Sequence, residues 1–289
     1  MRVLDYFQPG TVAEAVACLA KSPGTTKILA GGTDLIIQLR EGSVTPDYIL
    51  DLGHIQDLRG VGEADNCLVI GSMTTFTAIE YNPLVRKYIP MLAQAAGSVG
   101  SPQIRNSGTI GGNLANAATA ADTVPALLAL EARAVLASGR GERQVAIGEL
   151  LAGINKTHIA KDEILVKFIV PIPAGSTCGT FVKLGRRKAL AIARLNLGLT
   201  VSLQEEGSIS KVTLALGAVG TTAYRVHEVE EYLTGKMPAP EIFEAAGELV
   251  LQVVANKLGS RPTASYKKTI AKAALKRALA QVGTECGRW

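Results

Sequence analysis

The sequence has few aromatic residues, little net charge and no long apolar run, and each shortage excludes a class of protein. Only 4% of its 289 residues are aromatic, which leaves little for a surface that stacks on nucleic-acid bases. The net charge of +5 is modest and scattered, so it does not indicate DNA or RNA binding. No apolar run reaches about 18 residues and the first residues lack a signal-peptide core, so we expect a soluble, cytoplasmic protein.

Cysteine and histidine are also scarce, which limits metal and nucleophile chemistry. No C-x-x-C pair occurs, so we expect neither an iron–sulfur cluster nor a structural zinc site in this chain. So few cysteines in a chain this long argue against a disulfide framework. No paired carboxylate, Ser–His or Cys–His arrangement is visible, and we predict no catalytic residue and no metal ligand. The residues concerned are Cys18, Cys67, Cys178, Cys286, His54, His158 and His227.

Glycine, by contrast, is abundant, and the order of the expected elements favours an α+β protein. Thr11, with Glu14 three residues later, predicts the start of a helix. A strand at 27–30, a helix from about residue 34 and a strand at 48–52 complete a small α/β unit. Further helices are expected at 90–99 and 122–130, and further strands at 67–71, 132–137 and 164–170. The segment 102–121 between them reads only as polar.

The best boundary in the chain is the segment Pro171, Pro173 and Gly175, which ends the strand at 164–170. Beyond it, three strand-like runs precede two helices, an order that indicates a compact α+β domain. The strands are expected at 180–184, 197–203 and 212–219, and the helices at about 241–256 and 265–281.

Two glycine-rich segments, 30–34 and 108–116, are the candidates for a binding site. Glycine lets backbone N–H groups approach phosphate oxygens closely, and Thr33, Thr109 and Asn113 add neutral donors. Paired glycines also make ordinary turns. Neither segment matches G-x-G-x-x-G, which disfavours a nicotinamide Rossmann site, and no G-K-[ST] follows, which removes the P-loop.

Together, in this order and separation, these segments resemble the FAD-binding (medium) subunit of the molybdenum hydroxylases, most closely that of bacterial xanthine dehydrogenases. The medium subunit of carbon monoxide dehydrogenases is similar. The resemblance rests on residues 29–36, 103–113 and 121–122, with further matches at 181–187, 191–196 and 265–268. It spans nearly the whole chain, and the Q-I-R-N…G-G-N block is its most specific part.

The resemblance implies an α+β fold with a PCMH-type FAD-binding domain, as in the vanillyl-alcohol-oxidase class, at residues 1–174. That domain would consist of two α/β subdomains, at about 1–57 and 58–174. A C-terminal flavoprotein domain at 175–289 would contain a small antiparallel sheet with helices. FAD would lie extended between these parts.

The same resemblance assigns roles to individual residues. Segments 29–36 and 109–113 would hold the pyrophosphate and adjoining parts of FAD, and Lys183 would reach the flavin from the C-terminal domain. From the residues alone, Asp122 could equally be a helix N-cap and Lys183 a solvated charge. Val99 stands where the animal xanthine enzymes have a stacking aromatic, which puts flavin stacking in doubt. The expected cofactor-binding residues are Leu29, Ala30, Gly31, Gly32, Thr33, Asp34, Leu35, Ile36, Val99, Ile104, Thr109, Ile110, Gly111, Gly112, Asn113, Asp122, Leu165, Lys183 and Ile192.

The implied function is electron transfer by an oxidoreductase subunit. A large partner would hold the molybdenum cofactor and a small partner two [2Fe–2S] clusters, whose electrons would pass through non-covalent FAD to NAD⁺ or another acceptor. Xanthine or another purine is the first substrate to consider, because the amino-acid sequence of these segments is closest to that of the xanthine enzymes. A carbon monoxide, heterocycle or aldehyde hydroxylase stays open, as does a non-catalytic assembly subunit that has lost FAD. A self-sufficient FAD oxidase is disfavoured, because neither a tethered flavin nor a base for a substrate is visible.

Overall fold

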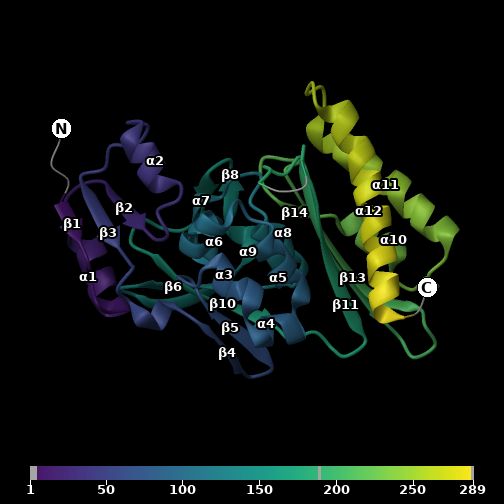
Figure 1. Ribbon diagram of the computed structural model, residues 1–289, viewed down its shortest axis with the longest axis horizontal. Coiled ribbons are helices and arrows are strands. Elements are labelled where there is room, and N and C mark those ends of the chain that lie inside the picture. Colours follow the sequence, from purple (N-terminus) through teal and green to yellow (C-terminus); the bar gives the residue numbers. More distant parts are fainter. Residues whose placement is uncertain (1–4, 188–189, 288–289) are drawn as a thin grey trace.

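The computed structural model describes residues 5–187 and 190–287, and its N-terminal part is a three-stranded parallel sheet (Figure 1). The strand order is β1 (Asp5–Phe7), β3 (Tyr48–Asp51), β2 (Thr26–Leu29). Helices α1 (Val12–Lys21) and α2 (Leu35–Arg40) connect the strands. The predicted start of α1 is confirmed: the Thr11 side chain accepts from the N–H of Glu14, and the Glu14 carboxylate accepts from the N–H of Gly10.

A five-stranded antiparallel sheet follows, in the order β4-β5-β10-β6-β7. Its strands are β4 (Val61–Ala64), β5 (Cys67–Gly71), β6 (Arg133–Ser138), β7 (Gly141–Ala146) and β10 (Ile164–Pro171). Short elements surround it: η1 (Gln56–Leu58), α3 (Phe76–Tyr81), α4 (Pro83–Tyr88), α5 (Pro90–Gly97), α8 (Thr123–Ala129), α9 (Ile147–Leu150) and the hairpin of β8 (Leu151–Gly153) and β9 (Lys156–Thr157). The expected strands and helices of this region are confirmed, while β4, β7 and the other short elements were not predicted.

The segment 102–121, which reads only as polar in the sequence, contains two helices, α6 (Pro102–Ser107) and α7 (Ile110–Asn116). Each begins at a capping side chain, since Ser101 accepts from the N–H of Ile104 and Thr109 accepts from the N–H of Gly112. Most of the second glycine segment is therefore helical, in spite of its glycines.

The C-terminal part is a four-stranded antiparallel sheet backed by helices. The sheet order is β11 (Thr177–Leu184), β12 (Leu195–Leu203), β13 (Ile209–Gly217), β14 (Tyr224–Arg225). The helices are α10 (His227–Leu233), α11 (Pro240–Leu258) and α12 (Ala264–Cys286). Three strands and two long helices match the predicted α+β arrangement, and the mixed α+β fold class is confirmed.

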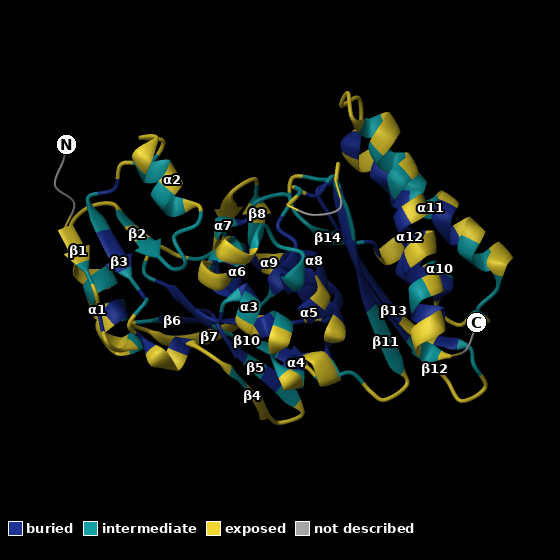
Figure 2. Cartoon of the chain, viewed as in Figure 1, coloured by how far each residue is buried: buried dark blue, intermediate teal, exposed yellow. Residues whose placement is uncertain are grey.

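The buried side chains form three clusters, and Figure 2 shows β13 buried along most of its length. One cluster fills the C-terminal sheet and its helices. A second lies between the five-stranded sheet and α3, α5, α7 and α8. The third joins Ala15 of α1 and Leu50 of β3 to Val135 of β6 and Val166 of β10. The N-terminal sheet therefore shares its core with the far face of the five-stranded sheet.

One pair of cysteines departs from the expectation. Cys178 of β11 and Cys286 at the end of α12 form a disulfide, across a sequence separation of 108 residues. Their separation in the sequence carried no sign of this pairing, which depends on α12 packing against β11. Cys18 and Cys67 are free. Over the described residues, no helix is both long and apolar enough to cross a membrane.

Candidate functional site

The first glycine segment makes the sharp turn from β2 into α2. Gly32 has φ +71°, in the left-handed region that glycine adopts most readily. Gly31 has no room for a side chain, because a Cβ there would lie 2.1 Å from the carbonyl oxygen of Ser107. Within 5–187 and 190–287, no residue accepts a hydrogen bond from the backbone N–H groups of Gly31, Gly32, Thr33 or Asp34. The turn thus offers consecutive donors to a ligand.

The second segment uses its donors differently. The N–H of Ile110 donates to the carbonyl of Thr74 (3.1 Å), and the N–H of Gly111 donates to that of Ser72 (2.8 Å). The N–H of Gly112 donates to the Thr109 hydroxyl (3.1 Å). A Cβ at Gly111 would lie 2.6 Å from the Cβ of Ser72, so this glycine serves a close packing contact. The N–H groups of these three residues are therefore already bonded within the chain.

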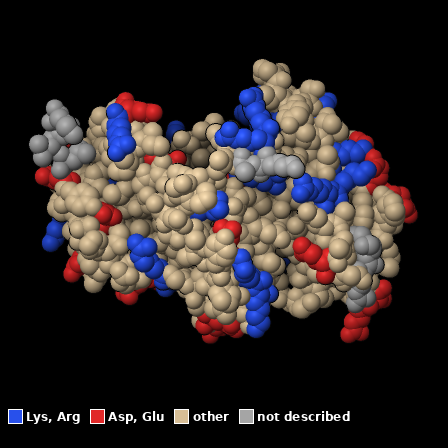
Figure 3. Space-filling view, in the orientation of Figure 1, with Lys and Arg blue, Asp and Glu red and all other residues tan. Residues whose placement is uncertain are grey.

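The two segments nevertheless lie side by side, as the sequence order alone could not show. Gly31 packs on the backbone of Ser107 and Gly108, and a Cβ on Gly112 would lie 3.5 Å from the Cβ of Ala30. Figure 3 shows this face of the molecule hollowed between the part that carries α2 and the upper end of the C-terminal part, where Lys and Arg side chains gather. An anionic ligand in the hollow would meet unpaired N–H groups on one side and positive charge on the other.

Asp122 and Lys183, which were predicted as separate contacts at different points along FAD, contact each other. The Lys183 ammonium donates to Asp122 Oδ2 (2.5 Å) and to the carbonyl of Ser98 (2.9 Å). The side chains are 7% and 14% exposed, so this is a largely buried ion pair between α8 and β11. Burial raises the pKa of the Asp122 carboxyl, while the Lys183 charge and the donors of Lys183 and Asn196 lower it. Lys183 is therefore not a solvated charge.

Asp122 occupies the N-cap position of α8, but its side chain makes no capping hydrogen bond. Its second carboxylate oxygen, Oδ1, accepts instead from Asn196 Nδ2 at 2.9 Å. Asn196 is fully buried on β12 and was not among the predicted site residues. A polar side chain within the apolar run of residues 195–201 was the available signal.

The remaining predicted residues differ in how far their side chains are exposed to solvent. Ile110 and Leu165 are buried in the central core, and Val99 packs against it half-buried. Asn113 Oδ1 accepts from the Thr123 hydroxyl (2.7 Å). Ile192 is 81% exposed, on the segment after β11. Half-buried positions are occupied by Leu29, Ala30, Leu35, Ile36 and Ile104.

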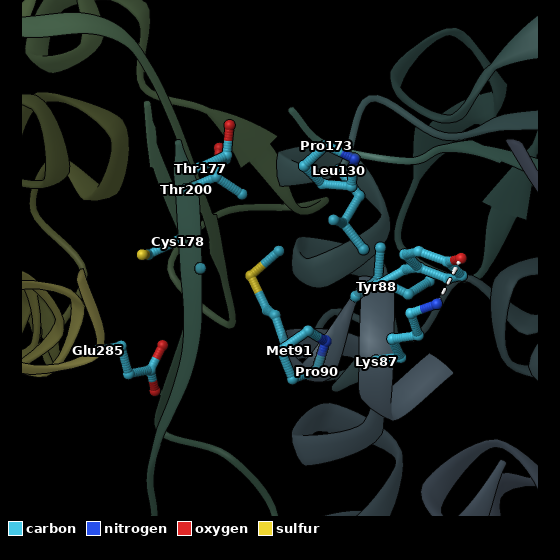
Figure 4. Close-up of a pocket in the computed structure, with 12 residues that line it drawn as sticks. Lys87, Tyr88, Pro90, Met91, Leu130, Pro173, Thr177, Cys178, Thr200 and Glu285 are labelled. Carbon is cyan, nitrogen blue, oxygen red and sulfur yellow. Dashed lines mark hydrogen bonds between the residues drawn. The ribbon is translucent and has the colours of Figure 1, made fainter. Parts of the chain in front are cut away.

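A cavity of about 170 Å³ lies elsewhere, between the end of α4, the start of α5 and β11 (Figure 4). Met91 and Pro90 lie on one side of it, and Cys178 and Glu285 on the other. None of the predicted site residues lines it, so it is separate from the candidate site.

Comparison with known proteins accounts for this arrangement. Residues 2–173 match the family described as the FAD binding domain in molybdopterin dehydrogenase, and residues 180–282 match the CO dehydrogenase flavoprotein C-terminal domain. The chain is 34% identical over 272 residues to the nicotinate dehydrogenase FAD-subunit of Eubacterium barkeri, covering 93% of this chain and 92% of that one. It is 34% identical to a putative xanthine dehydrogenase FAD-binding subunit of Escherichia coli, covering 96% and 97%.

A solved structure shows the same fold. Carbon monoxide dehydrogenase from Hydrogenophaga pseudoflava contains a chain that superposes with a TM-score of 0.92 at 31% identity, over 98% of both chains. The first family match covers the two glycine segments and Asp122, and the second covers Lys183 and strands β12–β14. The chain therefore belongs to the FAD-binding medium subunits of the molybdenum hydroxylases, and is an oxidoreductase subunit.

Proposed function

We propose that this chain takes electrons from a [2Fe–2S] partner subunit and passes them, through non-covalently bound FAD, to NAD⁺ or another acceptor. A large partner subunit would hold the molybdenum cofactor and choose the substrate. The relatives are named as FAD subunits or medium chains of dehydrogenases, and they match this chain over nearly its whole length. The flavin supplies the electron-accepting chemistry, and the chain supplies binding and orientation.

The observation that carries the proposal is the turn at residues 31–34. Its unpaired N–H groups face no acceptor in the described chain, and Gly31 packs so closely on Ser107 that the turn is fixed in place. A row of N–H groups without a Cβ in the way fits the pyrophosphate of FAD. The second segment would then fix the position of the first and contact FAD through side chains such as that of Asn113, whose Nδ2 has no acceptor among the described residues.

The other predicted residues would lie along FAD, toward its flavin end. Lys183, held by Asp122 and the Ser98 carbonyl, would place a positive charge where the reduced flavin carries negative charge. Ile192, which is well exposed, would contact the isoalloxazine, and Leu165 and Val99 would border it from the core side. We retain the whole predicted set, with residues 110–112 contributing through packing.

We also propose the domain limits given by the resemblance, residues 1–174 with subdomains at about 1–57 and 58–174, and residues 175–289. The family matches end at 173 and resume at 180, on either side of the turn that contains Gly175. The core that the N-terminal sheet shares with β6 and β10 supports placing both subdomains in one domain.

The substrate and the electron acceptor are the most specific parts of the proposal. Xanthine or another purine remains the first substrate to test on the assembled complex, with nicotinate and carbon monoxide next, because relatives named for all three are 31% to 34% identical. NAD⁺ is the first acceptor, and an artificial dye the comparison.

The test begins with the purified full chain and added FAD. We expect FAD to bind, to give flavin absorption bands, and to be released intact by acid or heat. If NAD⁺ is the acceptor, NADH should then reduce the bound FAD. If dithionite reduces the FAD and NADH does not, the proposal that the chain binds FAD stands and the electron acceptor is another molecule. A chain that takes up no FAD, alone or with its partner subunits, would instead favour the assembly role.

A further inference from the structure

Among the described residues, Asn196 is the side chain that donates to the Asp122 carboxylate oxygen that Lys183 does not contact. It lies on β12 and is fully buried, and its Nδ2 donates to Asp122 Oδ1 (2.9 Å) and to the carbonyl of Ala121 (3.2 Å). The Asp122 carboxylate therefore has a donor on each oxygen, a neutral amide on Oδ1 and an ammonium on Oδ2.

The orientation of this amide is set by its surroundings. Turning it over would point Oδ1 at a carboxylate and a carbonyl, which are both acceptors. In the observed orientation, Oδ1 is buried with no donor among the described residues. A buried acceptor without a partner costs about 1–3 kcal/mol. An apolar side chain of the same size would avoid this cost. The contribution of the amide to the site therefore lies in its N–H donors.

The neighbouring strand leaves room for the amide. Gly217 of β13 pairs directly with Asn196, and a Cβ on Gly217 would lie 2.1 Å from Asn196 Oδ1. Two positions on adjacent strands thus combine to place one polar group beside Asp122.

We propose that Asn196 is a positioning residue for the flavin: by fixing the Asp122 carboxylate, it fixes the Lys183 ammonium. This inference rests on the proposed function, which places Lys183 beside the flavin. Lys183 has three N–H donors, and Asp122 and the Ser98 carbonyl use two of them. One N–H is left for a ligand, and its direction depends on the other two.

Few groups act on Asp122, which makes the effect of Asn196 measurable. Among the described residues, Lys183 of β11 is the charged group that acts on it, and β12 contributes the neutral Asn196. Ser98, the C-cap of α5, contributes its carbonyl to Lys183. Loss of the Asn196 donor removes one of the interactions that lower the pKa of the Asp122 carboxyl. The carboxyl then takes up a proton at higher pH, and Lys183 loses its charge partner there.

The experiment follows the reduction potential of FAD bound to the full chain as a function of pH, in wild type, Asn196→Leu and Asp122→Asn. Relative to Asp122→Asn, the wild-type curve should show a step where Asp122 titrates, because a lone Lys183 charge favours reduced flavin. Asn196→Leu should move that step to higher pH. Between the two step positions, the ratio of reduced to oxidised flavin at a fixed potential should differ about tenfold, equivalent to about 30 mV for a two-electron couple. The double variant Asp122→Asn/Asn196→Leu should have no step.

Thr200→Val is the matched control. Thr200 lies on the same strand, four residues further on, and its buried hydroxyl bonds to that of Thr213, away from Asp122. This variant should lose stability and keep the wild-type pH curve. Asn196→Ala, which removes the same donor without adding a charge, replaces Asn196→Leu if the latter does not fold, and should move the step in the same direction.

The outcomes separate the two proposals. A step shifted to higher pH in Asn196→Leu, or in Asn196→Ala, supports positioning by Asn196. If Lys183→Met changes the potential while neither Asn196 variant alters the pH curve, Asn196 is only structural and the proposed function stands. If Lys183→Met also leaves the potential unchanged, Lys183 is not beside the flavin, and both proposals fail at this end of the site.

Discussion

The two glycine segments look alike in the sequence and differ in what their backbones do. In the first, the N–H groups of residues 31–34 meet no acceptor among the described residues. In the second, the N–H groups of residues 110–112 are paired with Thr74, Ser72 and Thr109. Both contain a glycine in close contact with neighbouring backbone, Gly31 on Ser107 and Gly111 on Ser72. Glycine content therefore marks close packing in both places, while a run of consecutive unpaired donors, at residues 31–34, occurs in only one of them among the described residues.

The variant with the largest expected effect is Gly31→Ala, which tests the role of the first segment in FAD binding. A Cβ 2.1 Å from the Ser107 carbonyl oxygen forces the two segments apart. Overpacking of this kind costs about 1–3 kcal/mol, so we expect FAD to bind up to about a hundredfold more weakly. Equilibrium dialysis with FAD measures the effect. Gly62→Ala, on an exposed strand with nothing near the added Cβ, is the control. Binding within threefold of wild type would remove the first segment as the phosphate site.

Gly111→Ala tests the second segment. Its Cβ would lie 2.6 Å from the Cβ of Ser72, so we expect the free energy of unfolding to fall by about 2 kcal/mol. FAD binding to the folded variant should change less than in Gly31→Ala. Urea unfolding and FAD titration of the same sample give both numbers. A large loss of binding with unchanged stability would reverse the roles that we assign to the segments.

Two threonines sharpen the comparison at the level of single hydroxyl groups. Thr109→Val removes the N-cap of α7 and should lower the free energy of unfolding by about 1 kcal/mol. It should weaken FAD binding less than Thr33→Val, because the Thr109 hydroxyl already accepts from the N–H of Gly112. The Thr33 hydroxyl has no partner among the described residues, so Thr33→Val should leave stability unchanged and weaken FAD binding about tenfold. Equal effects of the two changes on binding would contradict the distinction.

The smallest effect concerns Asp122, beyond the second segment. Burial raises the pKa of this carboxyl in the folded chain above its ordinary value of 3.8. Its contribution to stability is then complete below that ordinary value and is lost as the pH rises through the raised one. The unfolding free energy of wild type, minus that of Asp122→Asn, should therefore fall as the pH rises from about 4. A difference that grows with pH would show that Lys183 outweighs burial.

Much of the fold was predictable because its signals are local. The capping of α1 by Thr11 and Glu14, the apolar run of β10 and the proline pair after it depend on neighbours in the sequence. Helix α7 was not predicted, because its glycines disfavour a helix and only Thr109 and the contact with Ser72 compensate for them. The six-residue helices α3, α4 and α6 are too short to show a period.

The site was predictable mainly through family resemblance. That resemblance named Asp122 and Lys183 as separate cofactor contacts, and the structure joins them in one ion pair. Asn196 escaped prediction because its contact with Asp122 depends on how β12 crosses α8. The pairing of Cys178 with Cys286 depends in the same way on tertiary packing.

That disulfide also has a topological consequence. The chain from Cys178 to Cys286 forms a covalent ring that contains nearly the whole C-terminal sheet and all three of its helices. A single cut in the exposed turn at residues 204–206, between β12 and β13, opens the ring without separating it into two molecules. After limited proteolysis there, electrophoresis should show one full-length band before reduction and two fragments after it.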